Sequence, residues 1–565
     1  MNSNNIIVQE YLSSLKEDKE LDYLFPILLN AMGFRIVQTA KESKGQSQYG
    51  KDIIAIGNDN KGVKCRWYFE LKGYENRDIT DKNYSIPDGI RESIIEAKDT
   101  AFHDSSIPEF NALPIKIALV HNGVLKTNIR PTFDGFISKE FTEGEFERWD
   151  IYHLTDLFSE FLFSAYLLSD EESNRLFKKI LAFLDTPDYD YRDFKLLVEL
   201  QFEKARNTTK GRIFTKLFAT LNLLEEIVFH YSKLNNNLIA AKECSKFLAI
   251  RTWSWILENR LETRRAVLNE FKKLLRTHYD VFYAYFKKTF PIARITNGLY
   301  AENGTFFEDI GYPLRCFEYL EDILHYCRLR LYYPNFDKEN ANSQAVRNKQ
   351  KDLLIELITN NSGFYRPILD NHSIAITQLF VFFAQQAGRR KKDIEFIVSY
   401  IFNTVHSIII NKLKHNRLPE LYNRVDVLAE SIAKNEKSEE YNDTSSILIG
   451  TLLELIVVLK SEDTYNEILK YLAKDLSIQI PYPNFDECDV EQLLFEKNMH
   501  DEYYVECLEP LPEKFEDFVI QIKEKNSDRV EYRTDKTGFS YLRYLTHSYF
   551  KNELEPNEWR KFLGT

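Results

Sequence analysis

The chain has 565 residues, of which 44% are hydrophobic and 28% charged, and its formal net charge is −12. This length is too great for one ordinary core, so we expect two to four domains of a soluble globular protein. The negative charge excludes a protein that coats nucleic acid through bulk positive charge, although a local basic groove or an acidic metal site is compatible with it.

The six cysteines are sparse and form no C-x-x-C pair, which excludes a disulfide framework and a zinc ribbon. The first residues lack the basic start and apolar run of a signal peptide. No uncharged apolar stretch reaches the length of a membrane span. We therefore expect a cytoplasmic protein without a membrane partner.

The first third of the chain predicts an alternation of helices and strands. Apolar residues at helical spacing predict a helix that ends near Ala31, and residues 34–38 predict a strand. A polar loop at 41–50 separates this strand from a short apolar run that Asp52 opens. The run ends in a strong turn signal at 57–62, after which a second apolar run begins.

Two antiparallel strands joined at this turn would place Asp52, near the start of one, beside Glu70, near the end of the other. Side chains alternate along a strand, so Glu70 and Lys72 are expected on one face. Carboxylates are ligands that Mg²⁺ prefers, and a neighbouring lysine can orient water or neutralise charge on a phosphate. The same short pattern also occurs in surface hairpins whose charges are solvated.

The surrounding sequence resembles the PD-(D/E)XK nuclease superfamily, and most closely its Mrr-like restriction-endonuclease branch. Residues 21–34 read LDYLFPILLNAMGF, like the first helix of that family. A strand, Gly50-Lys51-Asp52-Ile53 and Glu70-Leu71-Lys72 follow in the family's order. The resemblance covers about the first third of the chain and implies an α/β restriction-endonuclease-like domain there.

The resemblance also implies roles for individual residues. Asp52 and Glu70, with the carbonyl of Leu71, would hold the metal, and Lys72 would be the catalytic lysine. Asp22 stands where the family has a helix glutamate that helps to orient metal or water.

Two residues of this region differ from the family's pattern. The carboxylate of Asp22 is shorter than the family's glutamate, and Pro26 is unusual on that helix. Gln48, just before the Gly-x-Asp element, is a further candidate for the rim of the active site.

Beyond Lys72, a helix is expected at about 88–102, a strand at 115–120, and a strand at 149–154 that leads into a helix. This order is that of an α/β sandwich. His121, at a strand end, could contact substrate, but we interpret it as a structural turn histidine because the metal chemistry needs no histidine.

Composition changes near residue 186, so we predict a nuclease domain at 1–185 and a helical region at 186–565. Between 193 and 475 the patterns are long and amphipathic, which predicts an all-α array with a solenoid-like arrangement. A hairpin is expected in the tail, with strands at 529–533 and 539–542.

Four groups of basic residues stand out, at 204–216, 260–276, 389–392 and 412–417. Such groups can contact phosphates, and they can equally be solvated helix ends that complement the helix dipole or pair with acidic residues.

The combined interpretation is a Mg²⁺-dependent endonuclease, with Mn²⁺ as a possible substitute, that hydrolyses phosphodiester bonds in DNA. The helical region would bind substrate, sense a signal, or mediate contact with a partner protein or a second copy. This architecture is similar to effectors of bacterial anti-phage defence. The alternative is a non-catalytic helical interaction protein that retains a remnant nuclease fold.

Overall fold

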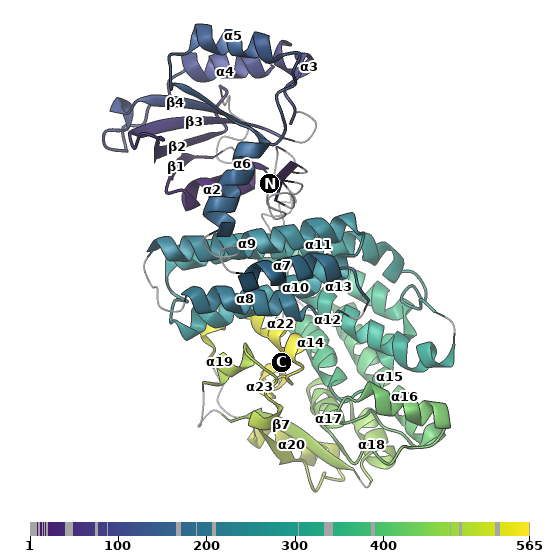
Figure 1. Cartoon of the computed structure of the whole chain (residues 1–565). Coiled ribbons are helices and arrows are strands. Elements are labelled where there is room, and N and C mark those ends of the chain that lie inside the picture. The colour runs from purple at the N-terminus through teal and green to yellow at the C-terminus, as the bar shows by residue number, and fades with distance from the viewer. Residues whose placement is uncertain are drawn as a thin grey trace. The chain divides into compact units, whose positions relative to one another are not determined.

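The computed structural model (Figure 1) describes residues 8–563 except 10–11, 14, 16, 18–20, 40–48, 74–76, 88, 165–170, 188, 206–210, 303, 333–342, 386–389, 475, 485–488 and 526–530. The chain forms two compact units. The first, called the sheet unit, comprises Met1–Cys244 and Asn269–Thr277, and the second, called the helical unit, comprises Ser245–Leu268 and His278–Thr565. The division therefore falls later in the chain than the expected boundary near residue 186.

The sheet unit begins with an α/β region and continues into helices. Its α/β elements are α2 (Asp22–Ala31), β1 (Arg35–Gln38), β2 (Ile53–Asn58), β3 (Lys64–Lys72), α3 (Asp81–Tyr84), α4 (Ile90–Asp99), β4 (Ile115–His121), α5 (Arg130–Glu140), β5 (Phe146–Trp149) and α6 (Ile151–Phe158). The helices that follow are α7 (Glu171–Phe183), α8 (Arg192–Ala205) and α9 (Gly211–Leu234). Two further helices, α10 (Leu238–Glu258) and α11 (Arg265–Ala293), have residues in both units.

The five strands form one mixed sheet in the order β1-β2-β3-β4-β5. The β1–β2 and β2–β3 pairs are antiparallel, and the β3–β4 and β4–β5 pairs are parallel. Parallel neighbours require a crossover connection, which α4 and α5 supply. The N-terminal α/β region is therefore confirmed at this level.

Helices cover both faces of this sheet (Figure 1), and the two faces are built from alternate strand residues. Tyr68 and Ile54 pack with Ala97 of α4 on one face. On the other face the ring of Phe25, from α2, lies 5.2 Å from that of Phe69. The side chains of β3 are buried from residue 65 to residue 71, so charged groups at its end lie against a packed interior.

Two details near the end of the sheet differ from the sequence expectations. The strand expected at 149–154 ends at Trp149, because the Asp150 side chain accepts hydrogen bonds from the amides of Tyr152 and His153 and starts α6. The crossover helix α5 was not predicted. Its apolar positions are few, namely the buried Phe133 and Phe136 and the partly buried Ile137, in a short segment that also contains proline and glycine.

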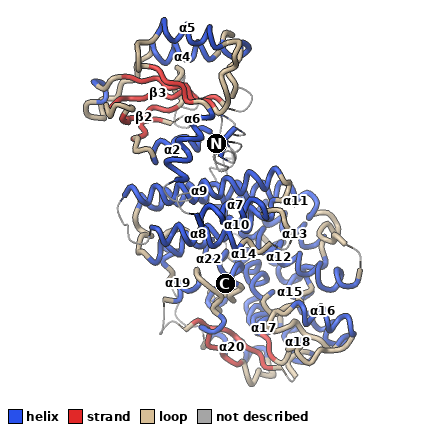
Figure 2. Tube along the Cα trace, in the orientation of Figure 1, coloured by secondary structure: helices blue, strands red, loops and turns tan. Residues whose placement is uncertain are grey.

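The helical unit is built mostly from helices: α12 (Tyr312–Tyr332), α13 (Ser343–Asn360), α14 (His372–Ala384), α15 (Lys391–His415), α16 (Val425–Lys434), α17 (Ile447–Leu459), α18 (Glu462–Tyr471), α19 (Val490–Leu494), α20 (Phe515–Glu524), α21 (Arg533–Lys536), α22 (Ser540–Phe550) and α23 (Asn557–Arg560). A small sheet joins β6 (Ser445–Ser446), β7 (Ser477–Pro483) and β8 (Tyr503–Cys507). Figure 2 shows these strands in red next to α20.

The helices of this unit enclose a common core and do not form a solenoid. Helices α12, α14 and α17 are buried along nearly their whole length. The C-terminal helices α22 and α23 pack back on α14, and α23 also packs on α17. In a solenoid each repeat contacts only its sequence neighbours, so these long-range contacts exclude that arrangement.

A buried ion pair fastens the C-terminal segment to this core. Arg560 Nη2 lies 2.5 Å from Glu454 Oε1, and Arg560 Nε donates to Glu454 Oε2 at 2.9 Å. The indole of Trp559 donates to the same carboxylate at 2.7 Å. Both charged side chains are fully buried, so each depends on the other for compensation of its charge.

The C-terminal tail differs from the sequence expectation. The prediction of the second strand of a hairpin there is wrong, because residues 540–550 form the helix α22. Residues 526–530, in the region of the first strand, lie outside the described residues.

Among the residues described, α15 is long and apolar enough to cross a membrane by length and composition alone. It packs against α14, α17 and α18.

Candidate functional site

The β2–β3 hairpin brings Asp52 beside Glu70. Ile53 pairs with Phe69 in the antiparallel ladder, and Asp52 N donates to Phe69 O at 2.9 Å just before it. The next position outward therefore sets Asp52 against Glu70. The predicted hairpin and its register are confirmed.

Glu70 and Lys72 lie on the same face at the end of β3, as the alternation along a strand predicts. The ammonium of Lys72 is 2.9 Å from Oε1 of Glu70. The Glu70 side chain is 6% exposed and that of Lys72 is 16% exposed. A pair with this little exposure is not the solvated surface hairpin that the short pattern also allowed.

Asp52 is held in place by the neighbouring strand. The amide of Leu71 donates to its Oδ2 at 2.7 Å. Burial, and then the nearby charge of Glu70, raise the pKa of Asp52 to about 8, against the opposing effect of Lys72. Two carboxylates are thus forced together in a poorly solvated place, which favours a bound cation.

A third carboxylate reaches the site from the N-terminal segment. Oε1 of Glu17 lies 3.3 Å from Nζ of Lys72. Burial alone would lower the pKa of Lys72, but Glu70, Glu17 and Asp52 together raise it above its usual range. Lys72 is therefore a cation at neutral pH. Glu17 was missed in the sequence, where it belongs to a charged stretch at 16–20 without a distinctive pattern.

The two remaining candidates from the sequence are placed differently. Asp22 is the first residue of α2 and is half-buried. Gln48 lies outside the described residues. Glu17, also in the N-terminal segment, places its carboxylate against Lys72.

The tight turn before Asp52 depends on a glycine. Gly50 has φ +65°, and a Cβ there would lie 1.9 Å from the carbonyl oxygen of Ser93 in α4. The next side chain, Lys51, is buried and donates to the carbonyl of Tyr49 at 3.0 Å. Burial lowers the pKa of Lys51 to about 8. Close contact with α4 therefore fixes the backbone that carries Asp52.

His121 lies next to Lys72 in the parallel β3–β4 register and is fully buried. Its Nδ1 lies 2.9 Å from the carbonyl oxygen of Arg77, so Nδ1 is the protonated nitrogen. Burial lowers the pKa of His121 to about 4, and it is neutral at pH 7. This placement fits the structural role expected for it.

The donor set fits a hard divalent cation. Among the described residues there is no group of three or more His, Cys, Asp and Glu side chains that could hold a metal. Mg²⁺, however, is commonly bound through one or two carboxylates, with waters and substrate phosphates completing the shell. Asn122 N donates to the carbonyl of Lys72, so the Leu71 carbonyl, one residue earlier, points to the opposite side, where Asp52 lies.

The described residues of the basic group at 389–392 form ion pairs within the chain. Arg390 lies 2.6 Å from Asp393 and 2.8 Å from Asp352, and Lys392 lies 2.9 Å from Asp352. The group at 412–417 forms the last turn and cap of α15, where positive charge complements the helix dipole. Parts of the groups at 204–216 and 389–392 lie outside the described residues.

Comparisons of the chain with protein-family models, with curated proteins and with solved structures find no match. Any function for this chain therefore has to be inferred from its own residues.

Proposed function

We propose that the sheet unit is a metal-dependent nuclease that hydrolyses phosphodiester bonds in DNA. The observation that carries this proposal is the pair of carboxylates at the ends of adjacent strands, Asp52 and Glu70, with the ammonium of Lys72 2.9 Å from Glu70. This combination differs from a simple ion pair, because one lysine faces the buried carboxylate of Glu70 together with the carboxyl groups of Glu17 and Asp52.

In this proposal Asp52, Glu70 and the Leu71 carbonyl hold Mg²⁺ or Mn²⁺. A bound divalent cation supplies Lewis acidity and lowers the pKa of a bound water. Lys72 carries its proton firmly, because the surrounding carboxylates raise its pKa. It therefore acts as a hydrogen-bond donor and positive charge that orients water or offsets charge on the phosphate, and not as a general base.

The charge balance of the site explains why a cation would be required. The carboxyl groups of Asp52, Glu70 and Glu17 surround one lysine. Burial and the charge of Glu70 raise the pKa of Asp52 to about 8, so Asp52 is mostly protonated at pH 7 without a metal, and the negative charge comes from Glu70 and Glu17, which outnumber Lys72. Such a group repels a phosphodiester until a divalent cation is bound. The preference for DNA and a role in anti-phage defence rest on the family resemblance, and we include both in the proposal.

The test is cleavage of plasmid and linear DNA by the full chain with Mg²⁺ or Mn²⁺. Glu70→Gln and Lys72→Ala should each lower the rate by at least about a hundredfold. Glu147→Gln is the matched control, because Glu147 pairs with Lys116 at 3.1 Å on neighbouring strands of the same sheet. Equal rates in all variants would reject the site.

If the wild-type chain does not cut DNA, Mn²⁺ titration by calorimetry separates the remaining cases. Binding that disappears in Asp52→Asn would support the metal site and point to a missing activator or another substrate. Absence of Mn²⁺ binding would reject the proposal and favour the non-catalytic interaction protein.

A further inference from the structure

A cavity of about 470 Å³ lies entirely within the helical unit. Its wall comes from α12, α13 and α14 and from the C-terminal segment that includes α21, α22 and α23. The volume falls within the range of about 300–1,000 Å³ that is typical of small-molecule sites. The proposed nuclease chemistry, which resides in the sheet unit, makes no use of it.

The cavity is lined by charged side chains, of which Arg328, Arg543, Glu555 and Glu558 are buried. Its basic residues are Arg328, Arg347, Arg543 and Lys561, and its acidic residues are Asp535, Glu555 and Glu558. Burial, and then the nearby charge of Glu558, raise the pKa of Glu555 to about 8, so this side chain is mostly neutral at pH 7. The lining is therefore net positive near neutral pH.

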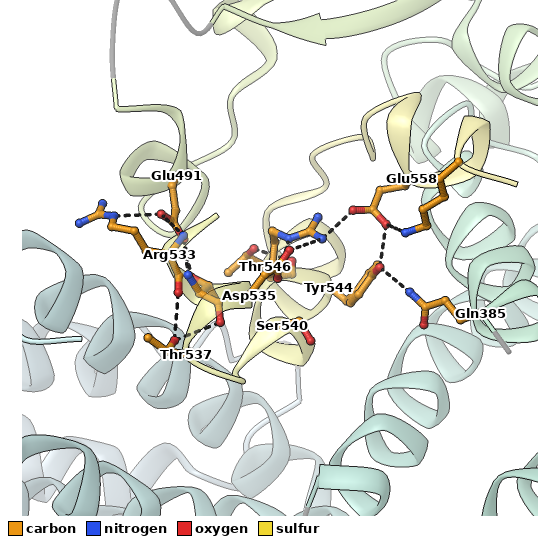
Figure 3. Close-up of polar contacts among 12 residues, drawn as sticks. Gln385, Glu491, Arg533, Asp535, Thr537, Ser540, Tyr544, Thr546 and Glu558 are labelled. Carbon is orange, nitrogen blue, oxygen red and sulfur yellow. Dashed lines mark hydrogen bonds and ion pairs between the residues drawn. The ribbon is translucent and has the colours of Figure 1, made fainter. Parts of the chain in front are cut away.

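The charged carboxylates are already committed to partners in the wall. Glu558 accepts from Arg543 Nη2 at 2.6 Å and lies 2.8 Å from Nζ of Lys561. It also accepts from the Tyr544 hydroxyl at 2.8 Å, and Tyr544 lies between Gln385 and Glu558 in Figure 3. Asp535 lies 3.2 Å from Arg543. These acids hold the wall together and are poorly placed to bind a cationic ligand.

Arg328 is a basic residue of the lining that forms no ion pair among the described residues, and its guanidinium lies 4.1 Å from the ring centroid of Tyr544. It is 4% exposed, and its guanidinium donates to the side-chain oxygen of Gln378 at 2.6 Å and to the Gln378 carbonyl at 3.1 Å. Among the described residues no carboxylate lies within ion-pair distance of it, and its Nε has no hydrogen-bond partner. Nη1 of Arg543, which is 3% exposed, likewise lacks a partner there.

A buried guanidinium with unused donors is costly unless an anion completes its shell. Planar guanidinium groups bind phosphate oxygens through paired hydrogen bonds. The cavity thus offers recognition for an anion such as a phosphate, supplied by a ligand because no acidic side chain of the wall lies within ion-pair distance of Arg328.

Aromatic rings form a further part of the lining. Tyr332 is 45% exposed, and its ring lies 4.8 Å from that of Tyr541, which is buried. The hydroxyl of Tyr332 is hydrogen-bonded to Ser540, which holds the ring at the cavity. An exposed, positioned tyrosine is a stacking surface for a flat heterocycle.

We propose that this cavity binds a nucleotide, with its phosphate toward Arg328 and its base against Tyr332. An anionic group and a flat ring in one small molecule satisfy both features of the lining. The helical unit then acts as a ligand-binding module that is independent of the proposed nuclease chemistry.

The test is calorimetric titration of the full chain with each of the four ribonucleoside 5′-monophosphates. EDTA is present, so that binding through a divalent cation at the Asp52–Glu70 site is suppressed. At least one nucleotide should bind with a Kd below about 1 mM. The matching nucleoside and inorganic phosphate should each bind at least about tenfold more weakly.

Two variants at the cavity should each weaken binding by about tenfold: Arg347→Gln removes a lining charge, and Tyr332→Ala removes the stacking ring. Each has a matched control outside the lining. Lys349→Gln changes an exposed lysine on the same helix as Arg347, and Tyr422→Ala removes a tyrosine that is 59% exposed.

Both pairs avoid the fully buried Arg328, whose replacement could unfold the unit. The controls should bind like wild type. Three results would overturn the proposal: no binding of any of the four nucleotides, equal affinity for inorganic phosphate and nucleotide, or unchanged affinity in both cavity variants.

Discussion

The main-chain amide of Leu71 donates a 2.7 Å hydrogen bond to the Asp52 carboxylate, although Asp52 precedes the first residue of β2. At the end of β3, the Asp52 carboxylate thus accepts the hydrogen bond that a main-chain carbonyl of a paired strand would otherwise accept. This contact fixes one proposed metal ligand against the backbone of another. Because β3 also carries Glu70 and Lys72, one strand end positions the whole group.

Replacement of Asp52 by asparagine should separate stability from metal binding. The amide side chain of Asp52→Asn keeps an acceptor for the Leu71 amide but removes a carboxylate that Glu70 repels. We expect the metal-free protein to be stabilised at pH 9 by about 1 kcal/mol, while Mn²⁺ binding is lost. Urea unfolding and Mn²⁺ calorimetry measure the two effects. Unchanged Mn²⁺ affinity would remove Asp52 from the metal site.

Gly50→Ala should both destabilise the sheet unit and weaken metal binding. The residue has φ +65°, and its added Cβ would collide with the carbonyl of Ser93. We expect a loss of about 1–3 kcal/mol, with displacement of Asp52. Gly62→Ala is the control, because Gly62 has φ +78° but open space around it. That variant should cost about 1 kcal/mol and leave Mn²⁺ affinity intact.

Glu454→Ala should strongly destabilise the helical unit. It would leave Arg560 buried without a charge partner and Trp559 without its acceptor. The expected cost is about 3–5 kcal/mol by urea unfolding. Glu440→Ala breaks an ion pair with the exposed Arg424 and should cost less than about 1 kcal/mol. Similar losses of unfolding free energy in both variants would show that burial does not determine how much the Glu454–Arg560 ion pair contributes to stability.

Buried carboxyls should make the helical unit less stable as pH rises from about 6 to about 8. Burial raises the pKa of Glu553 to about 7, and burial with the charge of Glu558 raises that of Glu555 to about 8, from a usual 4.5. The folded state therefore binds more protons than the unfolded state between pH 4.5 and these values. The contribution of each group to stability is full below about pH 4.5 and decreases by about 1.4 kcal/mol per pH unit above it, and it levels off above about pH 7 for Glu553 and about pH 8 for Glu555.

The measurement is the unfolding midpoint of the full chain in calorimetry at several pH values. Glu555→Gln should flatten the decrease above pH 7, because glutamine has no proton to lose. Glu439→Gln, at an exposed position, should leave the pH dependence as in wild type. A midpoint that rises with pH in the wild-type chain would contradict the assignment.

Local patterns in the sequence determined much of the sheet unit. The alternation along β3 predicted that Glu70 and Lys72 share a face, and the turn at 57–62 predicted the antiparallel register with Asp52. Both are local consequences of strand geometry and turn chemistry. The end of β5 was misjudged, because the apolar run continues through Ile151 and only the Asp150 cap marks the change to a helix.

Tertiary structure alone decided the remaining features, because they join segments that are distant in the chain. Glu17 reaches Lys72 across 55 positions, and nothing in its own sequence neighbourhood indicates that partner. The raised pKa of Asp52 comes from burial and from Glu70, which are properties of the packed sheet. The cavity of the helical unit likewise exists only where α12 and α14 meet the folded-back C-terminal helices, so side chains such as Arg328 and Tyr544 carry no signal of it in sequence.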